Sequence, residues 1–169
     1  MKTIKFLILS IMLISFYNCE DDGPDLQDIQ SVTVEDLHAP QEGGQGQPIS
    51  GQFTKFDFET GSETNSETDW DIAFRGTSII VNGGISLGTN DEPERSGNAG
   101  VYIFNGTMAE MVVVDTSLIT QDSSEGYAIA SGSGNGWYTY TGPPTYLISP
   151  TPGKILVFRT RDGKYAKME

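Results

Sequence analysis

The sequence predicts an all-β fold, a compact antiparallel sheet or sandwich in a single domain, from three observations. Apolar residues recur at every second position in several short runs, which is the period of a half-buried strand. No segment shows the sustained apolar period of 3.6 residues that an amphipathic helix requires. Glycine, proline, asparagine and aspartate separate the runs, as turns between short strands do. The length of 169 residues fits one domain.

The first residues of the chain indicate export. Residues 1–18 combine two lysines near the start with an apolar run over 4–14, which is typical of a signal peptide and too short to span a membrane. Cys19 follows directly and is the sole cysteine of the sequence. A lone cysteine at this place resembles the lipidated first residue of a bacterial lipoprotein; the alternative is a secreted protein with a free thiol. We expect a lipoprotein signal peptide over 1–18 and lipidation of Cys19.

An acidic segment connects this signal to the expected domain. Residues 19–30 are polar, with three acidic residues at 20–22 directly after the cysteine. This composition predicts a flexible tether, and acidic residues at that place resemble a surface-export tag of Gram-negative lipoproteins. We therefore expect a lipid anchor in the outer membrane, on the cell surface, and one β domain over 31–169. The last expected strand runs to Glu169 with no terminator, so we expect a truncated C-terminus.

The charge of the chain limits its partners. Lysine and arginine number 10 against 23 acidic residues, and the formal net charge is -13. Such a charge repels nucleic acid and anionic lipid head groups. We therefore expect no nucleic-acid partner, and contact with a membrane through the lipid anchor alone.

The domain should begin with short strands. Residues 31–34 favour a short first strand, whereas 39–51 are rich in glycine, glutamine and proline and predict a loop. Residues 53–59 alternate apolar with polar or charged side chains, so we expect a half-buried strand with Phe56 and Phe58 on one face.

The segment 69–75 alternates strictly and predicts a half-buried strand at the centre of the core. The side chains expected to face the core are Trp70, Ile72 and Phe74. Those expected to face the other way are Asp69, Asp71 and Arg75. Gly76 then predicts a turn or bulge that leads into a second strand at 78–81.

The middle of the chain predicts one further strand. Residues 101–104 favour a strand that ends in a tight turn at Asn105 and Gly106. The segment 108–114 mixes methionine and alanine with three valines, and we interpret it as a strand or irregular structure.

The last third predicts two pairs of short strands. Aromatic residues at 137–140 favour a strand, and a second short one is expected at 146–148. An Asp-Gly pair at 162–163 separates two β-prone runs and predicts a hairpin over 154–160 and 164–168.

No constellation in the sequence favours catalysis, and we predict that the protein is not an enzyme. Nucleophilic hydrolysis needs an imidazole beside the nucleophile, but the one histidine, His38, precedes a Gly-rich loop. Asp69 and Asp71 would lie about 7 Å apart on an extended strand, as an inverting glycosidase pair does. Alternating acids on a solvent face are the more ordinary case. The acidic run 90–94 offers oxygen ligands for calcium, although Pro93 interrupts it and a solvated loop is favoured.

Aromatic and sulfur-containing residues are the remaining candidates for a binding site. Three tyrosines lie around the Gly-Pro-Pro sequence at 142–144, where a rigid loop can present rings to a flat ligand. They are Tyr138, Tyr140 and Tyr146. Met108 and Met111 carry thioether sulfur, a soft ligand suited to haem iron. Packing in the core is the alternative role of both groups.

Three motifs, each ordinary alone, occur in a specific order and spacing. The first is Thr-Asp-Trp-Asp-Ile-Ala-Phe at 68–74. The second includes Gly-Trp-Tyr and Gly-Pro-Pro-Thr-Tyr within 136–146, and the third includes Phe-Arg-Thr and Asp-Gly-Lys-Tyr-Ala-Lys within 158–167. Together they resemble the HmuY family of haem-binding lipoproteins, over about 53–169.

The resemblance implies an all-β fold in which two loops borne on the sheets hold a ligand between them, as a thumb and fingers would. It also implies a carrier in the outer membrane that binds haem and passes it to a TonB-dependent receptor, without enzymatic activity. On this interpretation the three tyrosines contact the porphyrin, and Met108 or Met111 completes the coordination of the iron.

The chain departs from the family at the iron ligands. The resemblance implies two histidines, one directly before the Gly-Pro of the aromatic loop, where this chain has Thr141, and one in a segment that is short here, between Gln121 and Trp137. Neither histidine is present, so haem is expected from the resemblance alone. The alternative is a surface lipoprotein of the same fold that binds a non-haem ligand or a partner protein.

Overall fold

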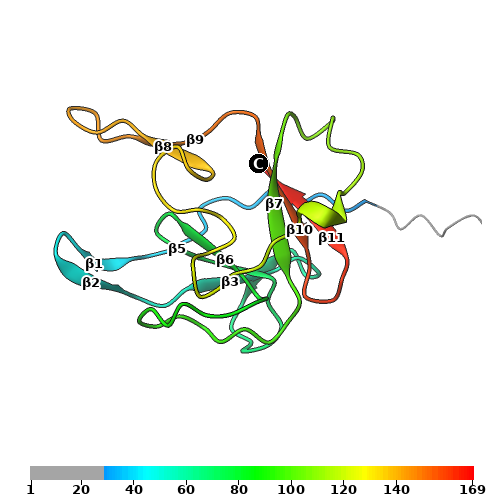
Figure 1. The fold of residues 1–169 in the computed structure, drawn as a ribbon, viewed down its shortest axis with the longest axis horizontal. Coiled ribbons are helices and arrows are strands. Elements are labelled where there is room, and N and C mark those ends of the chain that lie inside the picture. The colour runs from blue at the N-terminus through cyan, green and yellow to red at the C-terminus, as the bar shows by residue number, and fades with distance from the viewer. Residues whose placement is uncertain (1–28) are drawn as a thin grey trace, which may run out of the picture. The chain divides into compact units, whose positions relative to one another are not determined.

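The computed structural model describes residues 29–169, and these contain eleven β-strands and one 3-10 helix (Figure 1). The signal peptide expected over 1–18, the expected lipidation site Cys19 and the tether up to residue 28 lie outside the described residues. Between residues 29 and 169, no helix has the length and apolar character needed to cross a membrane.

Seven strands form the two larger sheets, both antiparallel. One sheet has the order β4-β3-β5-β6, with β3 at Thr54–Asp57, β4 at Ser62–Thr64, β5 at Ile72–Arg75 and β6 at Ser78–Val81. The other has the order β11-β10-β7, with β7 at Gly100–Asn105, β10 at Lys154–Arg159 and β11 at Tyr165–Met168. The 3-10 helix η1 spans Thr116–Leu118. The expected strands at 53–59, 78–81 and 101–104 and the terminal hairpin are confirmed apart from their end residues.

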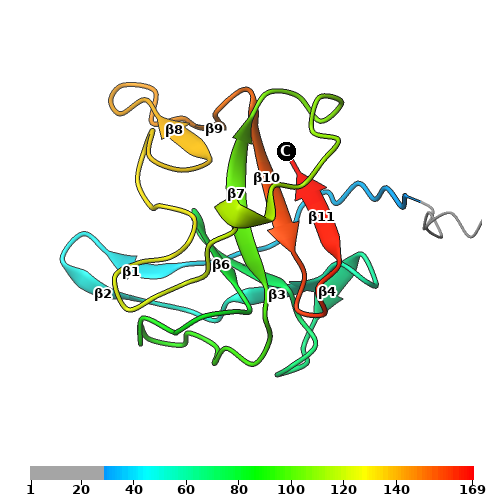
Figure 2. The same cartoon turned by 45° about the vertical axis from the view of Figure 1, so that its right-hand side comes forward.

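Two smaller hairpins project from these sheets. β1 (Glu42–Gly44) pairs with β2 (Gln47–Ser50), and β8 (Tyr138–Tyr140) pairs with β9 (Ile148–Pro150). Both hairpins extend on the side away from β10 and β11, the left-hand side in Figures 1 and 2. The fold therefore presents two projecting hairpins on one side of the sheets.

The β1–β2 hairpin corrects the expectation of a loop at 39–51. Its turn contains residues with positive φ, 51° at Gln45 and 94° at Gly46. A Cβ atom at Gly43 would meet the carbonyl oxygen of Pro48 at 2.0 Å, so the absence of a side chain lets the two strands approach. The glycines that indicated a loop instead shape a hairpin. The first strand expected at 31–34 does not form.

The two larger sheets share a central hydrophobic core. The four-stranded sheet contributes Phe56, Ile72, Ile79 and Val81 to this core. The three-stranded sheet contributes Val101, Leu156 and Phe158. These side chains are all buried, and burial between two antiparallel sheets is the packing of a sandwich. The all-β fold expected from the sequence, an antiparallel sheet or sandwich, is confirmed.

Each sheet also buries side chains of its other face, which corrects the expectation of half-buried strands. A second cluster on the four-stranded sheet, here called the Trp70 cluster, contains Phe53, Trp70, Ala73 and Ile80. A third cluster on the three-stranded sheet, the Met111 cluster, contains Met111, Ile155 and Val157. Trp70 thus lies apart from Ile72, which belongs to the central core, and from Phe74, which packs against that core. Regular β5 begins only at Ile72.

Asp71 and Arg75, expected to face solvent, are buried. The Asp71 carboxylate accepts hydrogen bonds from the backbone N–H of Phe58 at 2.8 Å and of Arg161 at 2.7 Å. Burial raises the pKa of Asp71 above its ordinary value. The Arg75 guanidinium lies 4.1 Å from the centroid of the Phe53 ring, a cation–π contact. Local alternation could not predict these partners, which come from distant parts of the chain.

Asp57 forms an ion pair that makes stability depend on pH. Its Oδ1 lies 2.8 Å from Nη1 of Arg161. Burial acts to raise the pKa of Asp57, but the hydrogen bonds from Arg161 and from the backbone N–H of Glu59 outweigh burial and hold the pKa below its ordinary value. A carboxyl with a lowered folded-state pKa stabilises the protein above its unfolded pKa of about 3.9, and this contribution is lost as pH falls through the folded-state pKa.

We therefore expect Asp57→Asn to lower the free energy of unfolding by about 1.5–3 kcal/mol at pH 7, the usual contribution of a hydrogen bond to a charged group. The difference from wild type should narrow as the pH is lowered below about 4. Urea denaturation of both proteins from neutral to acidic pH measures this difference. A difference that stays constant over the whole range would contradict the assigned ion pair.

Candidate functional site

The β8–β9 hairpin carries the tyrosines that the sequence selected. Tyr140 pairs with Ile148 across the two strands, and Tyr146 lies in the loop that joins them. Every residue from 139 to 148 except Gly142 is exposed. The hairpin therefore contributes little to the core and offers its side chains to solvent.

The base of the hairpin is attached to the β5–β6 turn through Thr77. The Trp137 indole Nε1–H donates to the carbonyl oxygen of Thr77 at 2.9 Å, and the Thr77 hydroxyl donates to Oη of Tyr138 at 3.2 Å. The Trp137 and Tyr138 rings lie with their centroids 5.2 Å apart, and Tyr138 is only 9% exposed. Tyr138 thus holds the hairpin in place, although the sequence grouped it with the ligand-binding tyrosines; its contact with a ligand stays a prediction.

Hydrogen bonds within the loop fix its conformation. The backbone N–H of Tyr146 donates to the carbonyl oxygen of Gly142 at 2.7 Å. The Thr141 hydroxyl lies 2.6 Å from that of Thr145 and accepts from the backbone N–H of Leu147 at 3.0 Å. Thr141, which stands where the resemblance implies a histidine, therefore has a structural role in the loop.

Four exposed side chains form what we call the hairpin tip: Tyr140, Tyr146, Leu147 and Ile148. Tyr146 is the most exposed of them at 63% and Tyr140 the least at 44%. Within the described part of the chain, the phenol oxygens of Tyr140 and Tyr146 have no hydrogen-bond partner. Leu147 and Ile148 were expected in a short strand, and their exposure was not predicted. An apolar pair between prolines, next to an aromatic strand, was the available signal.

Met108 and Met111 lie in another part of the structure. Met111 is buried in the Met111 cluster, and Met108 packs against that cluster. Nζ of Lys167 donates to both of their carbonyl oxygens, at 2.6 and 2.8 Å. The segment that follows β7 and the β8–β9 hairpin extend on opposite sides of β7 (Figures 1 and 2). The structure does not bring the methionines to the hairpin tip, and their binding of iron stays a prediction.

The acidic residues weighed for catalysis or metal binding have other partners. Asp69 is exposed and accepts hydrogen bonds from the Ser66 and Thr68 hydroxyls, whereas Asp71 is buried, so the two do not face one substrate. The backbone N–H of Gly51 donates to Asp91 at 2.9 Å. Over residues 29–169 there is no group of three His, Cys, Asp or Glu side chains that could hold a metal ion.

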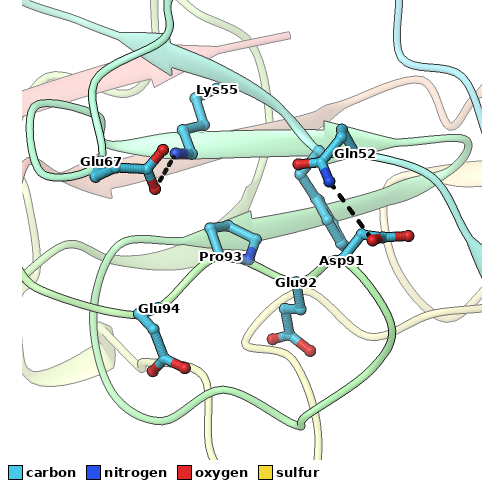
Figure 3. Close-up of a pocket in the computed structure, with 8 residues that line it drawn as sticks. Gln52, Lys55, Glu67, Asp91, Glu92, Pro93 and Glu94 are labelled. Carbon is cyan, nitrogen blue, oxygen red and sulfur yellow. Dashed lines mark hydrogen bonds and ion pairs between the residues drawn. The ribbon is translucent and has the colours of Figure 1, made fainter.

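A shallow polar cavity of about 280 Å³ lies beside β3 (Figure 3). Its lining includes Gln52, Phe53, Lys55, Glu67, Asp91, Glu92, Pro93 and Glu94. Lys55 pairs with Glu67 at 2.9 Å, and the Gln52 amide donates to Asp91 at 3.5 Å. Ligand pockets are mostly apolar with a few polar groups, whereas these walls are mainly polar, and four of their side chains are paired with each other. The cavity therefore does not suit a porphyrin, and the hairpin tip is the better candidate site.

Comparison with protein-family models assigns the chain to a known family. A family model described as HmuY protein matches residues 50–169. The match covers both larger sheets and the β8–β9 hairpin. No curated protein matches the chain. Because the family model matches more than half of the chain, this protein belongs to the HmuY family, whose known role is haem binding.

Proposed function

We propose that this protein is a cell-surface carrier, attached to the outer membrane by a lipid on Cys19, that binds haem at the hairpin tip and passes it to a TonB-dependent receptor. The observation that supports this most is the exposed tip itself: two tyrosines, a leucine and an isoleucine on a projecting hairpin of an HmuY domain. Large exposed apolar patches often mark sites where a protein binds a ligand or a partner.

The residues of the tip suit contact with the porphyrin ring better than coordination of the iron. Tyr140 and Tyr146 offer aromatic faces, and Leu147 and Ile148 offer apolar surface, for contact with a flat porphyrin. For the iron, the tip offers phenol oxygen, which binds haem iron in some proteins. It offers no imidazole, since His38, the one histidine, precedes β1. A carrier needs no catalytic group, and we propose no enzymatic activity.

Haemin titration of the purified protein tests this function. We expect a saturable shift of the Soret band, because the porphyrin leaves water for the apolar tip. Ile148→Asp should weaken this binding about tenfold or more by placing a charge on the contact surface. Val113→Asp is the matched control, since Val113 is 79% exposed on a different loop, and it should bind as wild type does.

Absence of a shifted band with both oxidised and reduced haem would contradict the carrier function. It would favour the second candidate, a surface lipoprotein whose hairpin tip binds a non-haem ligand or a partner protein. One observation supports that candidate: the Thr141 hydroxyl, at the place of an expected histidine, bonds within the loop. If Ile148→Asp and Val113→Asp weaken haemin binding equally, the binding site is not at the hairpin tip.

A further inference from the structure

We propose that Tyr146 is the residue that binds the iron, so that the cargo is the ferric rather than the ferrous porphyrin. This inference rests on the proposed haem-carrier function and makes it specific. It follows from the different surroundings of the three tyrosines, from the backbone conformation of Tyr146 and from the chemistry of a phenol oxygen.

The surroundings of the tyrosines distinguish their roles. The Tyr138 hydroxyl accepts from Thr77, and its ring is buried at the base of the hairpin. Tyr140 lies within β8, opposite Ile148, where its ring shares the apolar surface of the tip. Tyr146 lies in the loop and is the most exposed of the three, at 63% against 44% for Tyr140. Its phenol oxygen, like that of Tyr140, has no partner among residues 29–169. Tyr146 is therefore the best-placed oxygen donor on the tip.

The backbone at Tyr146 is held in an unusual conformation. Its φ is 51°, in the left-handed region that bulky L-residues rarely adopt. The hydrogen bond from its N–H to Gly142 and the bonds of the Thr141 hydroxyl to Thr145 and Leu147 surround this residue and fix it. Unfavourable conformations of this kind concentrate at ligand-binding positions. The loop thus positions the Tyr146 side chain at a cost to its own backbone.

Phenol chemistry selects the oxidation state. With haem bound, the phenol oxygen of Tyr146 would hold the ferric iron, and the proton of its O–H group would pass to solvent. The anionic oxygen neutralises the extra positive charge of ferric iron, which the ferrous form lacks. A hard oxygen donor therefore favours the ferric porphyrin, whereas a thioether would be the softer ligand. The oxidation state of iron does not change in this step.

The test separates contact with the iron from contact with the ring. Wild type, Tyr146→Phe and the matched control Tyr140→Phe are titrated with haemin, with dithionite-reduced haem and with iron-free protoporphyrin IX. We expect Tyr146→Phe to lose the phenolate-to-iron charge-transfer band and to bind haemin about tenfold or more weakly. Its affinity for protoporphyrin IX and its melting temperature should match wild type, because phenylalanine keeps the ring. Tyr140→Phe should keep the band.

Several outcomes would overturn the assignment. If Tyr146→Phe keeps the wild-type spectrum, or if Tyr140→Phe alone loses the band, haem binding stands but Tyr146 is not the ligand. Tighter binding of reduced haem than of haemin by wild type would exclude a phenolate ligand in the same way. If wild type binds neither haemin nor protoporphyrin IX, the proposed carrier function itself fails, and the assignment of Tyr146 fails with it.

Discussion

Replacing Trp70 by alanine should lower the free energy of unfolding by about 3–5 kcal/mol, the usual cost of removing a large buried aromatic side chain. Trp70 is fully buried in the Trp70 cluster with Phe53, Ala73 and Ile80. Its indole N–H donates to the carbonyl oxygen of Glu67 at 3.2 Å. The substitution therefore leaves a cavity on the outer face of the four-stranded sheet and removes the hydrogen bond to Glu67.

Urea denaturation followed by circular dichroism measures this loss. Leu147→Ala is a suitable control, because Leu147 is 56% exposed on the hairpin tip and should change stability by about 0.5 kcal/mol or less. If the two substitutions cost the same, the Trp70 cluster does not have the stabilising role that its burial indicates.

Replacing Asp122 by alanine should cost about 3–5 kcal/mol as well, the usual effect of removing one partner from a buried ion pair. Asp122 Oδ2 lies 2.8 Å from Nη2 of Arg95 and accepts from the backbone N–H of Val81 at 3.1 Å. Its Oδ1 accepts from the backbone N–H of Ala128 at 2.8 Å. Burial raises the pKa of Asp122 in spite of the arginine. Removing the carboxylate leaves these buried donors without their acceptor.

The same denaturation experiment tests Asp122, with Glu67→Ala as the matched control. Glu67 also pairs with a basic residue, Lys55, at 2.9 Å, but its side chain is 85% exposed. An ion pair at the protein surface contributes about 0.2–1 kcal/mol, so the loss of stability should be several-fold larger at Asp122 than at Glu67. If Asp122→Ala lowers the free energy of unfolding as little as Glu67→Ala does, this carboxylate does not hold the segment around Ala128 to β6.

The parts of the fold that could be predicted from sequence depend on local patterns. The Asp-Gly pair at 162–163 predicted the β10–β11 hairpin because a turn is set by the residues within it. Local composition gave the wrong prediction at 39–51. Its glycines indicated a loop, but backbone hydrogen bonds pair β1 with β2 there. Strand pairing uses backbone hydrogen bonds, so a glycine-rich composition cannot exclude a hairpin.

The burial of the charged residues could not be predicted, since it depends on contacts across the fold. Asp57 meets Arg161, which lies 104 residues further along the chain. Alternation indicates which side chains share a face of a strand, but it does not show which loop covers that face. The three tyrosines around the Gly-Pro-Pro sequence do lie on one hairpin, and their contact with a ligand stays a prediction. The structural role of Tyr138 could not be predicted, because it depends on Thr77, 61 residues away.

The attachment of the β8–β9 hairpin through Trp137, Tyr138 and Thr77 has a consequence for how this family can diversify. Residues 139–148 make little contribution to the hydrophobic core, so selection can change their chemistry at little cost in folding stability. The residue types and the length of this segment can then change while Trp137, Tyr138 and Thr77 stay the same. On the proposed function, a change within this one short segment is enough to alter ligand preference, so two chains with the same sandwich need not bind the same ligand.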